Sequence, residues 1–422
     1  MAPALTDEWV TQHFDYLSED LAPELPETLA RMRAQCPVAH SDAYGGYWIV
    51  TKYEDVLRVA QDWETFSSAH GLSVGGTGSS GVVRSLPVQV DPPEQRFFKK
   101  LINPFFTPKA IEPYEKPVRE LCNRLIDAFI DDGTCDFMDA FARPFPSLTF
   151  FEQALGADPA DLEHVAKMAS VSSIPNHPES RECWMGLYQW VKALLEARED
   201  GGTSRGDVVD AVLAAEKDGA PLPEADRIGI VQLLILGGLE TTAGALGLMF
   251  HRFCAQPEIP ALLRTRPDLI PRAVEELLRL DTSFLAVART AMRDVELGGC
   301  PVKAGDKVLL YWASAGRDED EFPNADTFDP ERDRNPHFAF GAGPHRCAGS
   351  NLARLNLRIA LEELLARLDD IRLADGADVH FHSTLTRAPL HLPITFTART
   401  AEARSPAPGA GADSARSQAP GA

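Results

Sequence analysis

A glycine-rich loop that ends in a single cysteine constrains this chain most. Residues 340–349 read Phe-Gly-Ala-Gly-Pro-His-Arg-Cys-Ala-Gly, and apolar residues recur at helical spacing from Leu352 onward. Cys347 is therefore expected near a helix N-terminus, where free N–H groups and the helix dipole favour a thiolate. A thiolate binds soft or redox-active metals, and the glycines let a flat, bulky group approach the backbone. A lone cysteine is more often a small buried apolar residue, but this spacing is too specific for that interpretation.

Composition and charge exclude several classes of protein. The 422-residue chain has 41 lysines and arginines against 62 acidic residues, and its net charge of −21 argues against binding nucleic acid or anionic membranes. Its seven scattered cysteines include no CxxC pair, which argues against a disulfide framework or structural zinc and favours a reducing cytoplasm. No signal peptide or membrane anchor is predicted, because the most apolar run, 228–239, is too short to span a bilayer.

Helical periodicity dominates the chain. Helices are predicted over residues 54–61, 93–102, 113–131, 183–198, 207–216, 224–255, 258–265, 270–280 and 350–368. Strands are predicted over residues 47–50, 308–311 and 392–396. No linker interrupts this pattern, so residues 1–400 are interpreted as one helix-rich domain. Residues 71–81 hold five glycines and three serines and are predicted to be a mobile loop. Residues 401–422 are rich in alanine, proline, glycine and serine and are predicted to be a disordered tail.

The longest predicted helix has an unusual middle. Residues 237–242 read Gly-Gly-Leu-Glu-Thr-Thr, and each glycine costs about 1 kcal/mol relative to alanine inside a helix. The hydroxyl of Thr241 can bond to the carbonyl of Gly237, four residues back, so a bulge or kink is expected here. One interpretation is a crossing where glycine permits close packing and Glu240 pairs with a base. The other is a functional site, because broken local rules often mark function.

The cysteine loop resembles the haem-ligand loop of the cytochrome P450 family. That resemblance implies a mainly α, helix-rich triangular fold with small β-sheets, and haem b (iron protoporphyrin IX) as the cofactor. It makes Cys347 the axial thiolate ligand of the haem iron. It also places Phe340, Gly341 and Gly349 at the cofactor.

The glycine-rich helix resembles the oxygen-binding helix of the same family. Its Gly-x-(Asp/Glu)-Thr pattern matches Gly238, Glu240 and Thr241 in order. By resemblance, Gly238 makes room for dioxygen, and Glu240 and Thr241 deliver protons so that one oxygen atom leaves as water.

A helical acid–base pair has two interpretations. Alone, Glu276 and Arg279 would be a solvated surface bridge worth less than about 1 kcal/mol. The pair matches the family's Glu-x-x-Arg signature, however, and Arg332 matches the arginine of its Phe-x-Pro-x-Arg pattern. The resemblance therefore implies a buried structural network of Glu276, Arg279 and Arg332 behind the haem loop.

Four residues are expected near the haem propionates or loop by their place in the family motifs. They are His345, Arg289, Gln95 and Lys99. Gln95 and Lys99 stand where the family usually has histidine and arginine. Lysine lacks the bidentate fork of arginine, so Lys99 is the weaker candidate.

The resemblance implies a bacterial-type monooxygenase that is a monomer and inserts one atom of O2 into an apolar small molecule, such as a terpenoid or another natural product. By position, the substrate pocket is expected to contain Leu86, Val88, Leu234, Leu285, Val287 and Leu385. The glycine-rich loop at 71–81 is a candidate entrance lid.

The chain holds no flavin or iron–sulfur module, so its electrons are expected from a ferredoxin-type donor and its reductase. The expected basic docking surface on the cysteine side consists of Arg96, Lys99, Lys100, Arg346 and Arg354. Three alternatives stay open at this point. They are a peroxide-driven enzyme, an oxidative-coupling haem-thiolate enzyme and a non-enzymatic haem-binding sensor.

Overall fold

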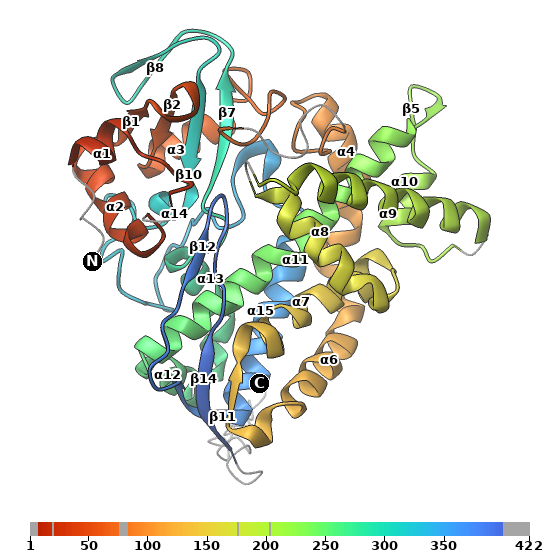
Figure 1. Cartoon of the computed structure of the whole chain (residues 1–422), viewed down its shortest axis with the longest axis vertical. Helices are drawn as coiled ribbons and strands as arrows, with labels where there is room; N and C mark the ends of the chain where they lie inside the picture. The colour runs from red at the N-terminus through yellow and green to blue at the C-terminus, as the bar shows by residue number, and fades with distance from the viewer. Residues whose placement is uncertain (1–6, 19–20, 76–82, 175–176, 202–203, 400–422) are drawn as a thin grey trace, which may run out of the picture.

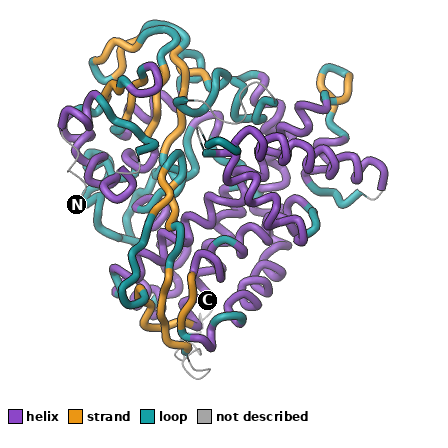
Figure 2. Tube along the Cα trace, viewed as in Figure 1, coloured by secondary structure: helices purple, strands orange, loops and turns teal. Residues whose placement is uncertain are grey.

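The computed structural model describes residues 7–18, 21–75, 83–174, 177–201 and 204–399. Helices fill most of the molecule, and most of the strands lie along one side (Figures 1 and 2). The outline narrows from a broad upper edge to a tip formed by β11 (Leu368–Leu373) and β14 (Pro393–Ala398) (Figure 1). The expected helix-rich triangular fold with small sheets is confirmed.

All nine helices predicted from periodicity are present. They are α3 (Tyr53–Gln61), α4 (Glu94–Ile102), α6 (Glu115–Asp127), α9 (Ser180–Gly201), α10 (Val208–Leu213), α11 (Glu224–Ala255), α12 (Glu258–Thr265), α13 (Ile270–Leu280) and α15 (Ser350–Arg367). The structure adds helices that the sequence pattern did not predict. They are α1 (Asp7–Gln12), α2 (Leu21–Gln35), α5 (Pro108–Ile111), α7 (Pro144–Thr149), α8 (Leu162–Ser173) and α14 (Trp312–Ala315).

The largest sheet has five strands in the order β1-β2-β10-β7-β3. The bounds are β1 Val38–Ser41, β2 Tyr47–Val50, β10 Lys307–Tyr311, β7 Ala286–Ala291 and β3 Phe66–Ser67. A second sheet pairs β11, β14 and β4 (Thr134–Asp136). The remaining pairs are β12 (Phe381–Ser383) with β13 (Arg387–Pro389), β5 (Glu216–Lys217) with β6 (Ala220–Pro221), and β8 (Val295–Leu297) with β9 (Cys300–Val302). The three predicted strands are thus confirmed as β2, β10 and β14.

Helix α11 runs diagonally through the helical part of the molecule (Figure 1). In the described part of the chain it is the single helix long and apolar enough to cross a membrane, but 61% of its most apolar window is buried inside the structure. Such burial is typical of a core helix. The expected bulge at residues 237–242 is wrong, because α11 is a continuous α-helix there. The predicted hydrogen bond from the Thr241 hydroxyl to the Gly237 carbonyl forms at 3.0 Å, and the expected kink stays a prediction.

The network behind the cysteine loop has the expected buried geometry. Arg279 and Glu276 are both fully buried, and two N–H groups of Arg279 donate to the two Glu276 oxygens at 2.7 and 2.8 Å. Arg332 Nη2 lies 3.4 Å from Glu276 Oε1, and Arg279 also donates to the carbonyls of Gly316 and Ala325. Burial alone would raise the pKa of Glu276, but Arg279 outweighs it and lowers that pKa. The planar guanidinium thereby joins α13 to the chain that leads into the loop.

Candidate active site

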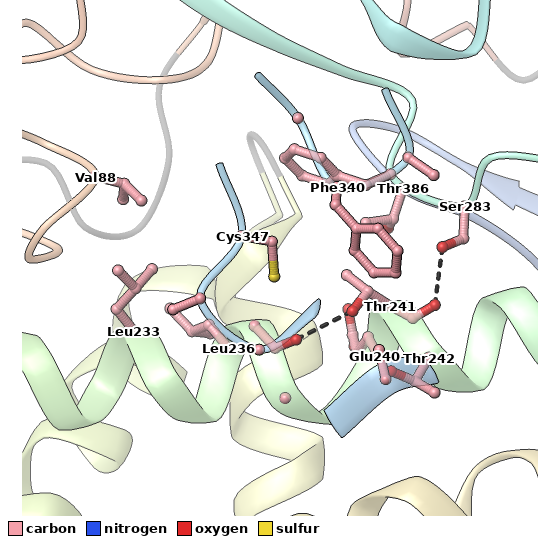
Figure 3. A pocket seen from close by; sticks show the side chains of 18 of the residues that line it. Val88, Leu233, Leu236, Glu240, Thr241, Thr242, Ser283, Phe340, Cys347 and Thr386 are labelled. Carbon is pink, nitrogen blue, oxygen red and sulfur yellow. Dashed lines mark hydrogen bonds between the residues drawn. The ribbon is translucent and has the colours of Figure 1, made fainter. Parts of the chain in front are cut away.

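The cysteine loop folds as a tight turn before α15. Gly341 and Gly343 have φ of +66° and +67°, which only glycine adopts without strain. The N–H of Cys347 donates to the carbonyl of Phe340 at 2.9 Å, which closes the loop. The sulfur of Cys347 points toward α11 (Figure 3). Cys347 thus lies at the floor of the space between the loop and that helix.

Two opposing effects act on the ionisation of the Cys347 thiol. Cys347 is exposed, and it lines the cavity. Desolvation raises the pKa of the thiol, whereas the Gly349 N–H and the charges of Lys99, Arg346 and Arg354 act to lower it. A bound metal cation would shift this balance decisively, because coordination deprotonates a thiol.

A cavity of about 430 Å³ separates the loop from α11. Its floor includes Cys347, and its opposite wall includes Glu240 and Thr241 (Figure 3). Phe340, Gly341 and Gly349 of the loop also line it. Most of the other lining side chains are apolar, with contributions from α8, α11, β7 and the turn between β12 and β13. Such a space suits a planar prosthetic group with a small apolar molecule above it.

The oxygen-helix motif is held by two hydrogen bonds. The Thr241 hydroxyl donates to the Gly237 carbonyl, and Ser283 Oγ donates to the Thr241 carbonyl at 2.8 Å (Figure 3). In the described part of the chain, the Glu240 carboxylate makes no hydrogen bond or ion pair, so the pairing of Glu240 with a base that the packing interpretation required is absent. An unpaired carboxylate beside a hydroxyl can carry protons.

The two glycines of the motif have different surroundings. A Cβ on Gly238 would lie 2.8 Å from two ring carbons of Phe150, so this glycine lets η6 (Phe150–Leu155) pack against α11. A Cβ on Gly237 would meet nothing within 4 Å, and Gly237 is exposed to the cavity. Gly237 is therefore the glycine that leaves open space in the cavity. The family motif does not include this position. The expected role of Gly238 at dioxygen stays a prediction.

Two buried groups fit an anionic prosthetic group. Arg289 is 4% exposed, and its one hydrogen bond among the described residues goes to the Ala288 carbonyl. Burial lowers its pKa to about 10, against the opposing charge of Asp91. His345 bonds through Nε2 to Ser68 Oγ at 3.1 Å, while its buried Nδ1 has no partner. Both residues line the cavity, and each would gain a partner from a haem carboxylate.

Gln95 and Lys99 lie at the loop by different contacts. Gln95 is buried and donates to the Pro344 carbonyl at 2.5 Å, but it is not part of the cavity wall, so its place is behind the loop. Lys99 lines the cavity and donates to the Arg346 carbonyl at 2.5 Å. Desolvation lowers the pKa of Lys99.

Four of the six residues expected in the substrate pocket line the cavity. They are Val88, Leu234, Val287 and Leu385. Leu86 and Leu285 are instead fully buried in the hydrophobic core. Their neighbours Pro87 and Phe284 line the cavity instead. Of the predicted entrance loop, residues 76–81 lie outside the described residues, as does the whole predicted tail, residues 401–422.

Sequence reasoning missed several cavity residues. They are Phe106, Phe150 and His382. Phe150 follows two prolines in a segment that reads poorly as helix, and the histidine stands in a short strand without a motif. Only tertiary packing brings them to the site.

Comparisons with known proteins agree with this geometry. The model of the cytochrome P450 family matches residues 162–370. Linalool 8-monooxygenase of Pseudomonas putida is 30% identical, with 82% of this chain and 89% of that protein covered. Steroid C26-monooxygenase of Mycolicibacterium smegmatis is also 30% identical, with 87% and 91% covered. The chain belongs to the cytochrome P450 family.

A solved structure supports the same assignment. Cytochrome P450 CYP109Q5 from Chondromyces apiculatus superimposes with a TM-score of 0.82 at 30% identity, covering 93% of this chain and all of that one. The chain is thus a cytochrome P450 monooxygenase by family, and the family implies haem with a cysteine thiolate ligand. Cys347, Arg289 and His345 are the residues here that fit this group.

The first prediction concerns Glu275, which ties α13 to α15 beside the loop. Its two oxygens accept from Arg354 at 2.7 Å, and His337 Nε2 lies 3.1 Å away. Burial opposes ionisation, but Arg354 and His337 outweigh it and lower the pKa of Glu275 from 4.5 to about 2. A depressed carboxyl pKa stabilises the fold above pH 4.5, and this stabilisation is lost as the pH falls toward 2.

Glu275→Gln should therefore lower the free energy of unfolding by about 2–3 kcal/mol near neutral pH, and the difference should shrink below about pH 4.5. Urea unfolding at a series of pH values measures it. Asp268→Asn, at an exposed pair with Arg266, is the control and should change stability little. A difference that is independent of pH would contradict the assignment.

The second prediction separates the two glycines. Gly238→Ala should destabilise the protein by about 1–3 kcal/mol, because the methyl group collides with Phe150. Gly237→Ala should leave stability equal or up to about 1 kcal/mol higher, since alanine is the better helix former. Its methyl group should instead weaken the binding of carbon monoxide or imidazole in the cavity. Unfolding curves and ligand titrations measure both effects, and identical behaviour of the two variants would refute the distinction.

Proposed function

We propose that this cytochrome P450 inserts one oxygen atom from O2 into an apolar small organic molecule, a terpenoid or another natural product, in the bacterial cytoplasm. The observation that carries this proposal is the largely apolar cavity with Cys347 on its floor and Glu240 and Thr241 on its opposite wall. Two relatives are named for linalool and for a steroid, which supports an apolar substrate. Haem b is the proposed cofactor.

Each part of the cavity has a distinct task in this proposal. A bound haem would supply the activation of dioxygen. Arg289 and His345 would hold its carboxylates, and Cys347 would ligate its iron. The apolar wall, including Leu234 and Val287, would orient the substrate and exclude water.

Proton supply is proposed for the wall opposite the cysteine. Glu240 would collect protons at its carboxyl oxygens, and the Thr241 hydroxyl would pass them toward the centre of the cavity. The hydrogen bond from Thr241 to the Gly237 carbonyl holds that hydroxyl in place. Reduction of one oxygen atom to water consumes two protons, so a supply close to the reacting centre is required.

The third prediction tests the ligand and the reaction together. The reduced protein with carbon monoxide should show the difference band of thiolate-ligated haem, and Cys347→Ala should abolish it. Cys183→Ser, at a partly buried cysteine that does not line the cavity, is the matched control and should keep it. A panel of terpenoids, steroids and polar compounds, scored by the haem spin-state shift, should favour the apolar members.

Turnover then distinguishes the alternatives. Oxygenated product with a ferredoxin, its reductase and NADH supports the monooxygenase. Product with hydrogen peroxide but none with the ferredoxin, reductase and NADH would overturn it in favour of a peroxide-driven enzyme. A coupled dimeric product would indicate oxidative coupling, and failure to oxidise any compound would favour a haem-binding sensor.

The proposed electron donor is a ferredoxin-type protein that docks on the cysteine side. Arg96, Lys100 and Arg346 are exposed there and form no ion pair within the described chain. Two further residues of the predicted surface are already engaged, since Lys99 donates to the Arg346 carbonyl and Arg354 pairs with Glu275. A small cationic dock of three residues in an acidic protein would attract an acidic partner.

The fourth prediction tests this dock. Arg96→Glu combined with Lys100→Glu should slow reduction by an acidic ferredoxin at least about tenfold at low salt, because charge reversal opposes association. Rising salt should slow reduction of the unmodified protein and narrow the difference in reduction rate between it and the variant. Arg181→Glu on α9 makes the same kind of charge change at an exposed arginine outside the dock and should have little effect. Reduction rates that do not respond to salt would exclude an electrostatic dock.

A further inference from the structure

The β12–β13 hairpin packs directly against one face of α11. A Cβ on Gly244 would lie 3.1 Å from the Arg387 carbonyl, and one on Gly247 would lie 3.0 Å from Pro389. Positions 240, 244 and 247 share one helix face, because residues four and seven apart lie above one another. Glu240 therefore continues this glycine face toward the turn of the hairpin.

His382 belongs to the first strand of that hairpin. It pairs in register with Ala388, whose Cβ would lie 3.3 Å from a Cβ on Gly244. His382 and Glu240 both line the cavity. Thr384 Oγ1 lies 3.2 Å from Nε2 of the ring. In the protonated ring both nitrogens carry a proton, so Nε2–H donates to the Thr384 hydroxyl and Nδ1–H is the donor left for another acceptor.

Among the charged groups near His382, Glu240 is the one whose charge shifts the pKa of the ring. Burial lowers the pKa of His382, and the Glu240 charge opposes that shift. On the facing strand, Arg387 turns its guanidinium onto Phe381, 4.0 Å from the ring centroid. His251, from α11, also packs against Phe381. Neither Arg387 nor His251 is paired with Glu240, whose carboxylate has no hydrogen bond or ion pair in the part of the chain described.

We propose that His382 is a positioning and proton-relay residue for Glu240, a role that rests on the proton supply proposed above. The protonated ring gives its Nδ1 proton to the Glu240 carboxylate, so an N–H bond breaks and an O–H bond forms. The neutral ring then takes up a proton at Nδ1 from a hydronium ion of the solvent. Glu240 gives its O–H proton to the Thr241 hydroxyl, which releases its own proton toward the centre of the cavity. Thr384 fixes the ring orientation through Nε2. The hairpin is thereby part of the proton supply as well as of the substrate wall.

A spectroscopic experiment tests the pairing without any turnover. NMR of the haem-loaded, reduced carbon monoxide complex with ¹³C-labelled histidine gives a titration curve for each ring. The signal that disappears in His382→Gln is that of His382. Glu240→Gln should lower the pKa of His382 by about half a unit or more, because a stabilising negative charge is removed. Thr242→Val, next to Glu240, is the control and should leave that pKa unchanged. An unchanged pKa in Glu240→Gln would overturn the proposal.

A second experiment tests the relay during dioxygen reduction, with no organic substrate. A ferredoxin, its reductase and NADH drive the protein, and consumed O2 divides between hydrogen peroxide (two electrons, two protons) and water (four electrons, four protons). His382→Gln should raise the peroxide fraction about twofold or more, because peroxide requires fewer protons at the site. In the unmodified protein the fraction should rise with pH as His382 loses its proton, at a pH below 6.5, the ordinary histidine value. His382→Gln should abolish this pH dependence.

The variants separate failure of this inference from failure of the proposed function. Thr384→Val keeps the imidazole but frees the ring, so an intermediate peroxide fraction supports positioning, and an unchanged fraction would exclude that role for Thr384. If Glu240→Gln raises the peroxide fraction while His382→Gln does not, the relay is wrong and the role of Glu240 stands. If Glu240→Gln also has no effect, the proposed proton supply itself is wrong. The carbon monoxide band of each variant shows that it is folded.

Discussion

Close approach of several segments to one helix is the constraint on which this site depends. Glycines on α11 allow it: Gly229 admits the carbonyl of Arg84, Gly238 admits Phe150, and Gly244 and Gly247 admit the β12–β13 hairpin. Glycine costs about 1 kcal/mol at each helical position, so local propensity alone disfavours this sequence as a helix. The contacts that a side chain would block offset that cost. A helix that looks poor in isolation is therefore well suited to be the common wall of a cavity.

The cavity is also electrically asymmetric. Arg289, His345 and Lys99 lie at the cysteine side, whereas Glu240 stands on the opposite wall. Buried cations without a counter-ion are unfavourable, and desolvation acts against the charge of Arg289 and Lys99. An anionic prosthetic group on that side would relieve this cost. The same arrangement keeps an acid away from the cysteine, where its negative charge would oppose ligation of a metal by a thiolate.

Much of the fold and part of the site could be predicted from the sequence because their signals are local. Long helices with regular apolar spacing were predicted with ends within a few residues, and the loop around Cys347 carries its own motif. The helices α2 and α7 were missed because each contains prolines, which normally argue against a helix. In α7 a proline lies at the first helical position, where no N–H is needed. That placement is visible only once the helix start is known.

The substrate wall could be predicted less well, since it depends on which way each extended residue faces. Leu285 and Phe284 are adjacent and both apolar, yet only Phe284 reaches the cavity. Both residues lie just before β7, where Phe284 bridges to Thr386 and the Leu285 N–H donates to the Leu385 carbonyl, so a segment far along the chain holds them in place. For Glu240, in contrast, the direction of the side chain could be predicted but its neighbour could not. Its helical position alone directs it toward whatever packs over Gly244 and Gly247, but the hairpin that does so lies 142 residues further along at His382. A motif read along one helix identifies the acid, and only the fold identifies the residue that faces it.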